Sequence, residues 1–450
     1  MPERRSGSRR APAGPGRRQA SRVLPAALVV LAVVAGAAGC SPTPGPVTGP
    51  PTATVAPRPV PVRDLPPEPL VPASPAPARH VPPEPEDALT RAVWVHLFDD
   101  TLKTRAGIDQ VVADMWTAHA TAVVVEVVRR HDAYYTSQVL PRTTDPALEP
   151  GLDVLAAMIE AADVRNLEVH AWVPIAPTWH EQYAGLPAPA GWVATEHGRD
   201  APEAERWVTR TADGTWTEYL DPALPEVREH VAAIVGEIAR DYDVDGIHLD
   251  YARYAAPDHG YHPRALERYR AETGATGTPA PDDPTWLAWR RAQVDALVAS
   301  AREAIEQSGR TPVLSAAVIS WGPGPDGPGT AGFAGTRAYR DALQDWAGWA
   351  ERGLVDVLVP MNYFREHDSD QAAWLRQWLA FERDLEVATG TPVVPGVAGY
   401  LNGRDAALTQ VGLAMQHAGA AALYSYQGST SDPAESLWWW LSAVDWTGAP

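Results

Sequence analysis

Short runs of β-branched residues alternate with longer amphipathic stretches over most of this 450-residue chain, and this alternation restricts its fold more than any other feature. Eight such runs occur, at 91–98, 122–128, 168–175, 246–251, 313–320, 355–363, 392–399 and 421–426. The helical stretches cover 104–118, 151–164, 225–240, 284–308, 338–352, 370–388 and 404–418, with a last short one at 434–444. Because parallel strands need crossover connections, the pattern predicts an α/β fold, a (β/α)8 TIM barrel. A doubly wound open sheet is the alternative, but no Gly-rich phosphate loop follows the first run.

Residues 1–40 have the features of an export signal. Seven Arg precede an apolar stretch at 24–35 that is too short for a membrane span. Small residues then lead to Cys40, the only cysteine of the chain, as in a bacterial lipoprotein processing site. We therefore predict a lipoprotein signal peptide, lipidation of Cys40, and an exported protein anchored in the membrane at the cell surface. An ordinary secretory signal with an incidental cysteine is the alternative.

The next segment is rich in proline, with 17 of the 45 prolines falling within residues 41–90. Proline lacks an N–H group and fixes φ, so we predict a disordered linker at 41–88 and a catalytic barrel at 89–450. Seven Arg and one Glu give residues 1–40 a charge of +6, which leaves −25 for the rest of the chain. Since nucleic-acid binding needs clustered Lys and Arg, this acidity argues against nucleic acid as a partner.

The segment around Asp250 carries the clearest chemical signal. His248 and Asp250 lie two residues apart in the fourth run, so their side chains share one face of the strand. Asp250 falls at the C-terminal end of that run, where barrel enzymes place their catalytic groups. We predict Asp250 as a catalytic carboxylate, nucleophile or base. A structural pair with Arg253, bracing the following loop, is the alternative.

Glycoside hydrolysis usually needs a second carboxyl group opposite the first. Glu126 stands inside the apolar second run, where an acid must be satisfied or functional, and we predict it as the proton donor. Ion pairing of Glu126 to Arg129 or Arg130 is the structural alternative. Loop acids are also candidates: Asp99, Asp100, Asp132, Glu181 and Asp258.

Aromatic and polar residues gather at the predicted strand ends, as expected of a mouth that holds a sugar ring with polar edges and apolar faces. Two connections are long, at 176–223 and 252–283, and both should project from the same end of the barrel. We expect these residues to contact the substrate: Trp94, His96, His170, Trp172, His248, Arg253, Tyr254, Asn362, Tyr363 and Tyr400.

An ordered series of motifs resembles a bacterial family, the glycosyl hydrolase-like family 10 proteins, over roughly residues 91–400. The motifs are RAVWV at 91–95, DAYYTS at 132–137, LEVHAW at 167–172, YLDP at 219–222, PEVR at 225–228, YDVDGIHLDY at 242–251, WRR at 289–291 and DVLVP at 356–360. The resemblance implies a barrel, an exported location and glycosidase activity, with bacterial cell-wall glycan as a substrate.

This chain departs from the family at several positions. The family often has Gln at the position of Glu126, and a second acid at the position of Tyr251. An Asn near the end of the third strand is replaced by Pro174 or Ile175, and an Arg after the second strand by Val128. Asp250 is retained, so the resemblance supports Asp250 and leaves the second carboxyl open.

The leading hypothesis is thus a glycoside hydrolase that acts on a polysaccharide without a cofactor or metal. One alternative is a metal-dependent hydrolase or deacetylase with His96, His170, His248 and Asp250 as ligands, residue types that suit zinc. Another is a lipoprotein that binds glycan without cleaving it, which the lack of a clear second acid suggests.

Overall fold

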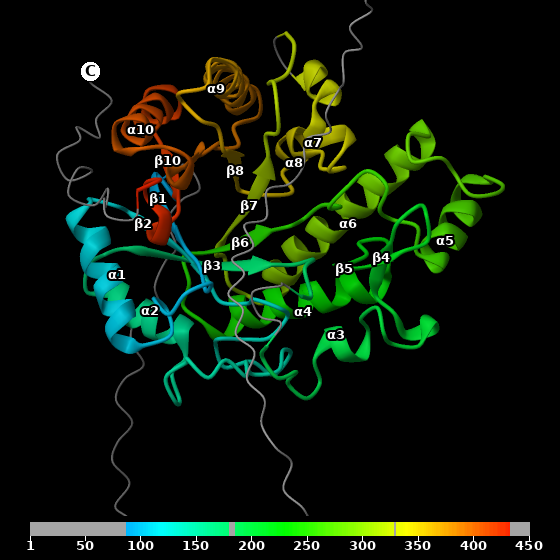
Figure 1. Ribbon diagram of the computed structural model, residues 1–450, viewed down its shortest axis with the longest axis horizontal. Coiled ribbons are helices and arrows are strands. Elements are labelled where there is room, and N and C mark those ends of the chain that lie inside the picture. Colours follow the sequence, from blue (N-terminus) through cyan, green and yellow to red (C-terminus); the bar gives the residue numbers. More distant parts are fainter. Residues whose placement is uncertain (1–86, 180–184, 328–329, 433–450) are drawn as a thin grey trace, which may run out of the picture. The chain divides into compact units, whose positions relative to one another are not determined.

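Eight parallel strands close into a barrel in the computed structural model, which describes residues 87–179, 185–327 and 330–432 (Figure 1). The strands are β1 (Arg91–Val95), β2 (Ala122–Glu126), β3 (Glu168–Pro174), β6 (Gly246–Asp250), β7 (Val313–Ile319), β8 (Val357–Asn362), β9 (Gly396–Ala398) and β10 (Ala421–Tyr424). Each falls inside one predicted run, and pairing of β1 with β10 closes the ring. The (β/α)8 prediction is therefore confirmed. The predicted signal segment and almost all of the predicted linker lie outside the described residues.

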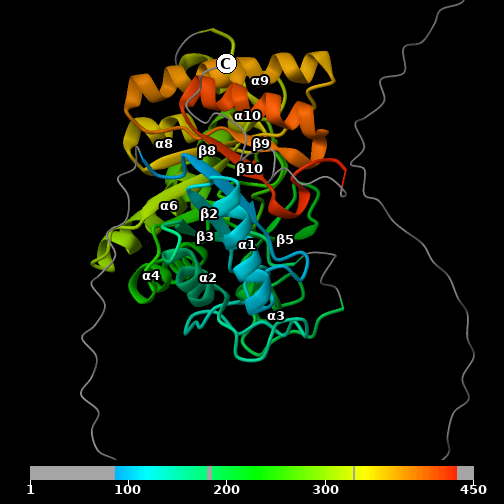
Figure 2. The same cartoon turned by 90° about the vertical axis from the view of Figure 1, so that its left-hand side faces the viewer.

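Long helices connect the strands and lie around the outside of the barrel (Figures 1 and 2). They are α1 (Arg105–Thr117), α2 (Val154–Asp163), α4 (Pro225–Asp241), α6 (Pro284–Gln307), α8 (Trp346–Arg352), α9 (Ser369–Thr389) and α10 (Arg404–Ala418). Asp or Thr side chains cap several N-termini; Asp153, for example, accepts a hydrogen bond from the backbone N–H of Ala156. None of the described helices is long and apolar enough to cross a bilayer.

One predicted helix is interrupted and another cannot be compared. The stretch 338–352 contains a short helix, α7 (Arg337–Arg340), and then α8. Between them Leu343 has a φ of 54°, a left-handed conformation that ends a right-handed helix. The helix expected at 434–444 lies outside the described residues.

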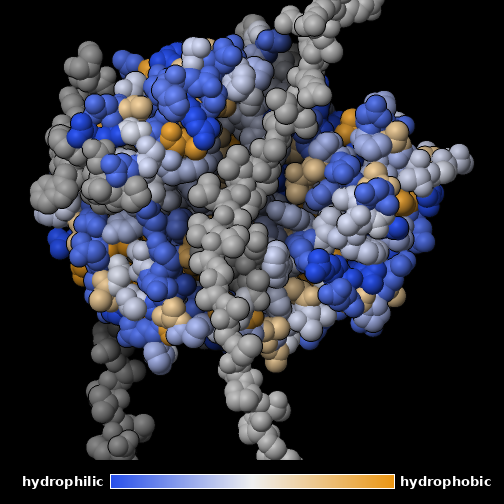
Figure 3. Space-filling view, in the orientation of Figure 1, coloured by the Kyte–Doolittle hydropathy of each residue, from blue (hydrophilic) through white to orange (hydrophobic). Residues whose placement is uncertain are grey.

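Two apolar layers follow from the alternation of side chains along the strands. Trp94, Val124 and Trp172 point into the barrel and belong to one apolar cluster in its interior. Val93 and Val95 point outward and pack against the surrounding helices. On the face shown in Figure 3 the outer surface is largely hydrophilic with scattered hydrophobic residues, as is usual for a protein surface.

The two long connections are ordered where the structure describes them. The first, after β3, contains α3 (Val193–Glu196) and an antiparallel hairpin of β4 (Val208–Arg210) and β5 (Trp216–Leu220), which the sequence did not predict. The second, after β6, contains α5 (Pro263–Thr273). Short 3-10 helices complete the described elements: η2 (Glu203–Glu205), η3 (Thr330–Gly335), η4 (Gly399–Leu401) and η5 (Tyr426–Gly428).

The guanidinium group of Arg290 fastens the second connection to α6. Its Nη1 donates a hydrogen bond to the carbonyl oxygen of Pro257 at 2.7 Å, and its Nη2 donates to that of Pro281 at 3.0 Å. The Arg290 side chain is completely buried. A buried cation with several acceptors holds a loop firmly, because each lost bond would leave a charged donor unsatisfied.

Outside the barrel, a buried acid on α9 contacts the end of β8. Asn362, which we expected at the substrate site, follows an inward-facing position by one residue and therefore points outward. Its Nδ2 donates to both carboxyl oxygens of Glu382, at 2.9 and 3.1 Å. Burial raises the pKa of Glu382 to about 8, although the bond from Asn362 opposes this shift.

Glu382→Gln should therefore change how stability depends on pH. In the unfolded chain a Glu ionises near about pH 4.3, whereas folded Glu382 keeps its proton up to about pH 8. Between these values the folded protein binds the extra proton, so wild-type stability falls as pH rises, by at most about 1.4 kcal/mol per pH unit. The melting temperature of Glu382→Gln minus that of the wild type should increase from pH 5 to pH 8. The exposed Glu351→Gln is the control, and an equal, pH-independent difference for both variants would contradict this prediction.

Candidate active site

A pocket with a cavity volume of about 210 Å³ opens at the C-terminal ends of the barrel strands. This position is typical of the active site of a barrel enzyme. Six of the predicted site residues line it: Trp94, Trp172, Asp250, Arg253, Tyr363 and Tyr400. Residues that we had not singled out as site residues also line it, among them Phe98, Arg129, Trp179, Tyr219, Tyr251 and Tyr424.

Asp250 is the last residue of β6, and its carboxyl group lies at the bottom of this pocket with only 6% of the residue exposed. Oδ1 accepts a hydrogen bond from the backbone N–H of Tyr251 at 2.7 Å, and Oδ2 accepts one from Nε1 of Trp172 at 3.2 Å. Burial raises the pKa of Asp250, opposed by the positive charge of Arg253 and by these two bonds. Asp250 is thus an acid held in fixed geometry whose protonated form is favoured by its surroundings.

Glu126, at the end of β2, also faces the barrel interior but lies beneath the pocket lining and is fully buried. One carboxyl oxygen accepts a hydrogen bond from the backbone N–H of Leu97 at 2.7 Å, and the other forms an ion pair with Arg129. Burial raises the pKa of Glu126, the Arg129 charge opposes this, and the charge of Asp250 raises it slightly further. The ion pair that we gave as the structural alternative is present, and the two acids share one electrostatic environment.

Arg253 lies three residues beyond Asp250, with no ion pair to it within 4 Å in the described chain. Its guanidinium carbon lies 4.5 Å from the centre of the Tyr251 ring and 5.5 Å from that of Trp321. Tyr251 itself has a φ of 58°, so the chain turns sharply between the acid and the cation. This turn brings both charged groups to the same pocket wall.

Aromatic rings form most of the remaining wall. Tyr424, at the end of β10, lies with its ring centre 6.2 Å from that of Trp172, 5.4 Å from Tyr363 and 5.9 Å from Tyr400. Burial raises the pKa of Tyr424, and the charge of Glu126 and then that of Asp250 add to the rise. Neutral phenols and indoles thus surround the carboxyl group of Asp250, which suits the faces and edges of a sugar ring.

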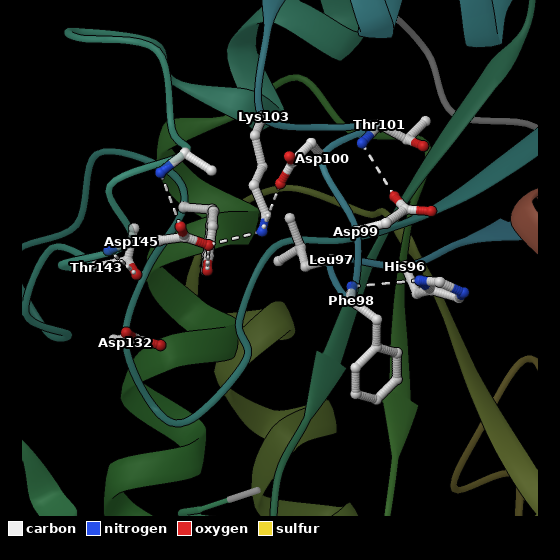
Figure 4. Close-up of polar contacts among 12 residues, drawn as sticks. His96, Leu97, Phe98, Asp99, Asp100, Thr101, Lys103, Asp132, Thr143 and Asp145 are labelled. Atoms are coloured by element: carbon white, nitrogen blue, oxygen red, sulfur yellow. Dashed lines mark hydrogen bonds and ion pairs between the residues drawn. The ribbon is translucent and has the colours of Figure 1, made fainter. Parts of the chain in front are cut away.

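The loop after β1 carries two ring systems and is itself well anchored (Figure 4). The Lys103 ammonium group forms ion pairs with Asp145 at 2.8 Å and Asp100 at 3.2 Å. Nδ1 of His96 accepts a hydrogen bond from the backbone N–H of Phe98 at 3.3 Å. His96, which we expected to contact substrate, is therefore turned toward its own loop, and Phe98 lines the pocket instead.

Two of the predicted histidines lie deeper in the barrel than expected. His248 is fully buried, accepts a hydrogen bond from Nε1 of Trp94 at 3.2 Å and shares another with Oγ of Ser315 at 2.8 Å. His170 is also fully buried, one further layer below, and lies so close to Gly246 that a Cβ there would be 2.1 Å from its Nδ1. Both histidines are on the same strand face as a residue at the strand end. They lie two or four residues closer to the strand start, however, and so their side chains do not reach the pocket.

Two further predicted residues point elsewhere. The Tyr254 hydroxyl donates to Oδ1 of Asp221 at 2.9 Å, within the packing between the two long connections. Asn362 faces α9, as described above. These residues and the two deep histidines do not line the pocket, so their predicted contacts with substrate differ from the arrangement observed.

Among the described residues, no three His, Cys, Asp or Glu side chains gather in an arrangement that could hold a metal ion. The metal-dependent alternative considered above needs its ligands to lie together. They are instead spread over different depths of the barrel: His96, His170, His248 and Asp250. The barrel mouth therefore does not assemble that ligand set.

The sequence carries a signal for one of these lining residues. Tyr424 is among the aromatic residues at the predicted strand ends, and it continues the inward-facing alternation of Ala422 in the eighth run. Tyr219 could not be predicted in this way, because it reaches the pocket through the β4–β5 hairpin, which is held to the end of β3 by a bridge between Pro177 and Tyr219.

Comparison with known proteins identifies relatives of this chain that are named glycosyl hydrolases. Glycosyl hydrolase YngK of Bacillus subtilis (strain 168) is 27% identical over 265 residues, which are 57% of this chain and 48% of the relative. Glycosyl hydrolase DigH of Escherichia coli (strain K12) is 28% identical over 283 residues, 60% of each chain. The chain spans less than two thirds of the length of either relative.

Solved structures with the same fold are more distant in sequence. The glycoside hydrolase domain of PgaB (BpsB) from Bordetella bronchiseptica has 14% identity and a TM-score of 0.50, over 75% of this chain and 94% of that domain. The β-amylase catalytic domain from Paenibacillus polymyxa has 10% identity and a TM-score of 0.53, over 80% and 94%. These similarities support the barrel fold alone. Residues 89–403 match the family described as Glycosyl hydrolase-like 10, and the chain belongs to this family.

Proposed function

We propose that this protein is a glycoside hydrolase in which Asp250 donates a proton to the oxygen of the leaving sugar. The observation that carries this proposal is a buried carboxyl group at the end of β6, open to a pocket walled by aromatic rings. Its raised pKa favours the protonated form, as a proton donor requires. From the sequence we expected Asp250 to act as nucleophile or base, so this role differs from our first hypothesis.

Glu126 then serves as a positioning residue and not as the proton donor. It is fully buried beneath the lining, and both carboxyl oxygens already accept bonds, from Leu97 and Arg129. Its partner Arg129 lines the pocket, with its guanidinium carbon 3.3 Å from the centre of the Phe98 ring. Glu126 therefore fixes an arginine at the wall, which in turn lowers the Asp250 pKa slightly.

The proposed substrate is a polysaccharide, with bacterial cell-wall glycan as the first candidate. Support comes from the family of the chain, from relatives named glycosyl hydrolases, and from the signal-like residues that precede the barrel. Trp172, Tyr363, Tyr400 and Tyr424 offer apolar faces to sugar rings, and Asp250 offers the acid.

Asp250→Asn should reduce kcat/KM on a glycan by about 100- to 10,000-fold, the usual contribution of general acid catalysis. Aryl glycosides with good leaving groups need little protonation, so the same variant should retain far more activity on them. Release of reducing ends and of the aryl alcohol measures the two reactions. Glu382→Gln, also a buried acid changed to its amide, is the matched control and should keep full activity on both.

Equal loss on both kinds of substrate would assign Asp250 as nucleophile instead of acid. Binding of glycan by the wild type with no release of reducing ends, even after long incubation, would favour the alternative of a lipoprotein that binds without cleaving.

Trp172→Phe tests the proton-donor role through pH. The Trp172 N–H bond lowers the Asp250 pKa, so its removal should raise this pKa. If protonated Asp250 is the active form, the alkaline limb of the kcat/KM profile should move to higher pH. A shift of the acidic limb instead would indicate that the ionised form is active.

We also propose, from the sequence, that Cys40 is lipidated and anchors the protein at the outer face of the membrane. Cys40→Ser should release the protein from the membrane fraction of the cells that produce it, whereas Ser41→Ala should not. Cell fractionation and metabolic labelling with a fatty acid measure the two effects. Membrane retention of unlabelled Cys40→Ser would contradict this anchor.

A further inference from the structure

Arg253 presents a cation to the pocket without any partner in the described chain. Its Nε is buried, and its guanidinium group makes no hydrogen bond or ion pair with the described residues. The rings of Tyr251 and Trp321 lie 4.5 and 5.5 Å from the guanidinium carbon and hold the group at the pocket wall. The two terminal amino groups, Nη1 and Nη2, have no acceptor among the described residues and remain available for a ligand.

Three other arginines in buried surroundings have acceptors within the protein. Arg129, on the same pocket, is paired with Glu126. Arg130 forms an ion pair with Asp132 at 2.7 Å, and Arg290 donates to loop carbonyl oxygens. An unsatisfied charged donor in a partly buried site costs free energy. Because Arg253 lines the pocket beside Asp250, its lack of a protein acceptor points to an acceptor that arrives with the ligand.

The geometry favours a planar anion as that acceptor. A guanidinium group can donate two parallel N–H bonds from its terminal amino groups, which match the two oxygens of a carboxylate. Neutral hydroxyl groups of a sugar do not need a fixed cation. Arg253 also lies three residues from Asp250, so the anion would belong to the sugar unit at the bond that is cleaved or to its neighbour.

We propose that Arg253 binds a carboxylate on the sugar next to the scissile bond, so that the enzyme prefers glycans with acidic sugar units. This inference rests on the proposed hydrolase function, which it makes more specific. The carboxylate also neutralises the cation that holds the Asp250 pKa down. Binding of an acidic sugar should therefore raise the Asp250 pKa above that of the free enzyme, which favours the protonated acid.

The test compares two substrates and two enzymes. The substrates are bacterial cell-wall glycan strands freed of peptide, with their sugar carboxyl groups intact or chemically reduced to primary alcohols. The enzymes are the wild type and Arg253→Met, each assayed at the pH where it is most active. The wild type should prefer the intact glycan by about 10- to 100-fold in kcat/KM, the range for a charged hydrogen bond, and Arg253→Met should show no preference.

Arg337→Met is the matched control. Arg337 lies 5.3 Å from the centre of the same Trp321 ring but is exposed and ion-paired with Asp341 at 2.8 Å. This variant should keep the wild-type preference. Arg253→Lys should keep only part of it, because an ammonium group lacks the two parallel donors.

Two outcomes of the cleavage assay would overturn the proposal. Equal cleavage of both glycans by the wild type would reject the carboxylate site and leave the hydrolase function standing. An equal loss of activity by Arg253→Met on both glycans would show that Arg253 only adjusts the Asp250 pKa.

If the wild type cleaves neither glycan, the hydrolase function on this substrate fails. Binding to Asp250→Asn, measured by calorimetry, then still tests Arg253, since equal affinity for both glycans rejects the site.

Discussion

The alternation of side chains across a closed ring of parallel strands is the constraint on which the whole site depends. Successive residues point to opposite faces, so Asp250, Trp172 and Tyr424 reach the interior while Val93 and Val95 pack against helices. One residue further along β8, Asn362 faces outward and meets Glu382. Because the ring is closed, no strand can slip by one residue without moving an acid to the wrong side.

Depth within the ring decides which polar groups remain available for chemistry. In a lower layer, His248 forms hydrogen bonds with Trp94 and Ser315. Burial lowers the pKa of His248 to about 3. His248 is therefore a neutral support for the layer above. In the top layer the Asp250 carboxyl group and the Arg253 guanidinium group line the pocket. Asp250 is held by hydrogen bonds from Trp172 and from the backbone of Tyr251, and Arg253 lies against the Tyr251 ring.

Much of this architecture could be predicted from the sequence, and the limits have physical causes. The eight strands follow from local residue patterns, and Asp250 follows from its place at a strand end. His170 and His248 were placed on the correct face but at the wrong depth, which depends on how the strands are staggered against each other. Tyr219 reaches the pocket by a hairpin inside a long connection. The Arg129 partner of Glu126 is close in sequence and was among the alternatives, but its other partner, the backbone N–H of Leu97, comes from the loop after β1. The contacts of Tyr219 and Leu97 join segments that are far apart in the sequence, so local residue patterns do not predict them.

The fastening of the second connection to α6 has a consequence for how related proteins can diversify. Arg290 holds that loop at Pro257 by a hydrogen bond to its carbonyl oxygen. We therefore expect changes beyond Pro257 to leave the short turn that orients Asp250 in place. Insertions or deletions in the outer part of the loop would then leave the acid undisturbed. A lineage could in this way acquire new glycan preferences by exchanging loops while inheriting an unaltered chemical centre.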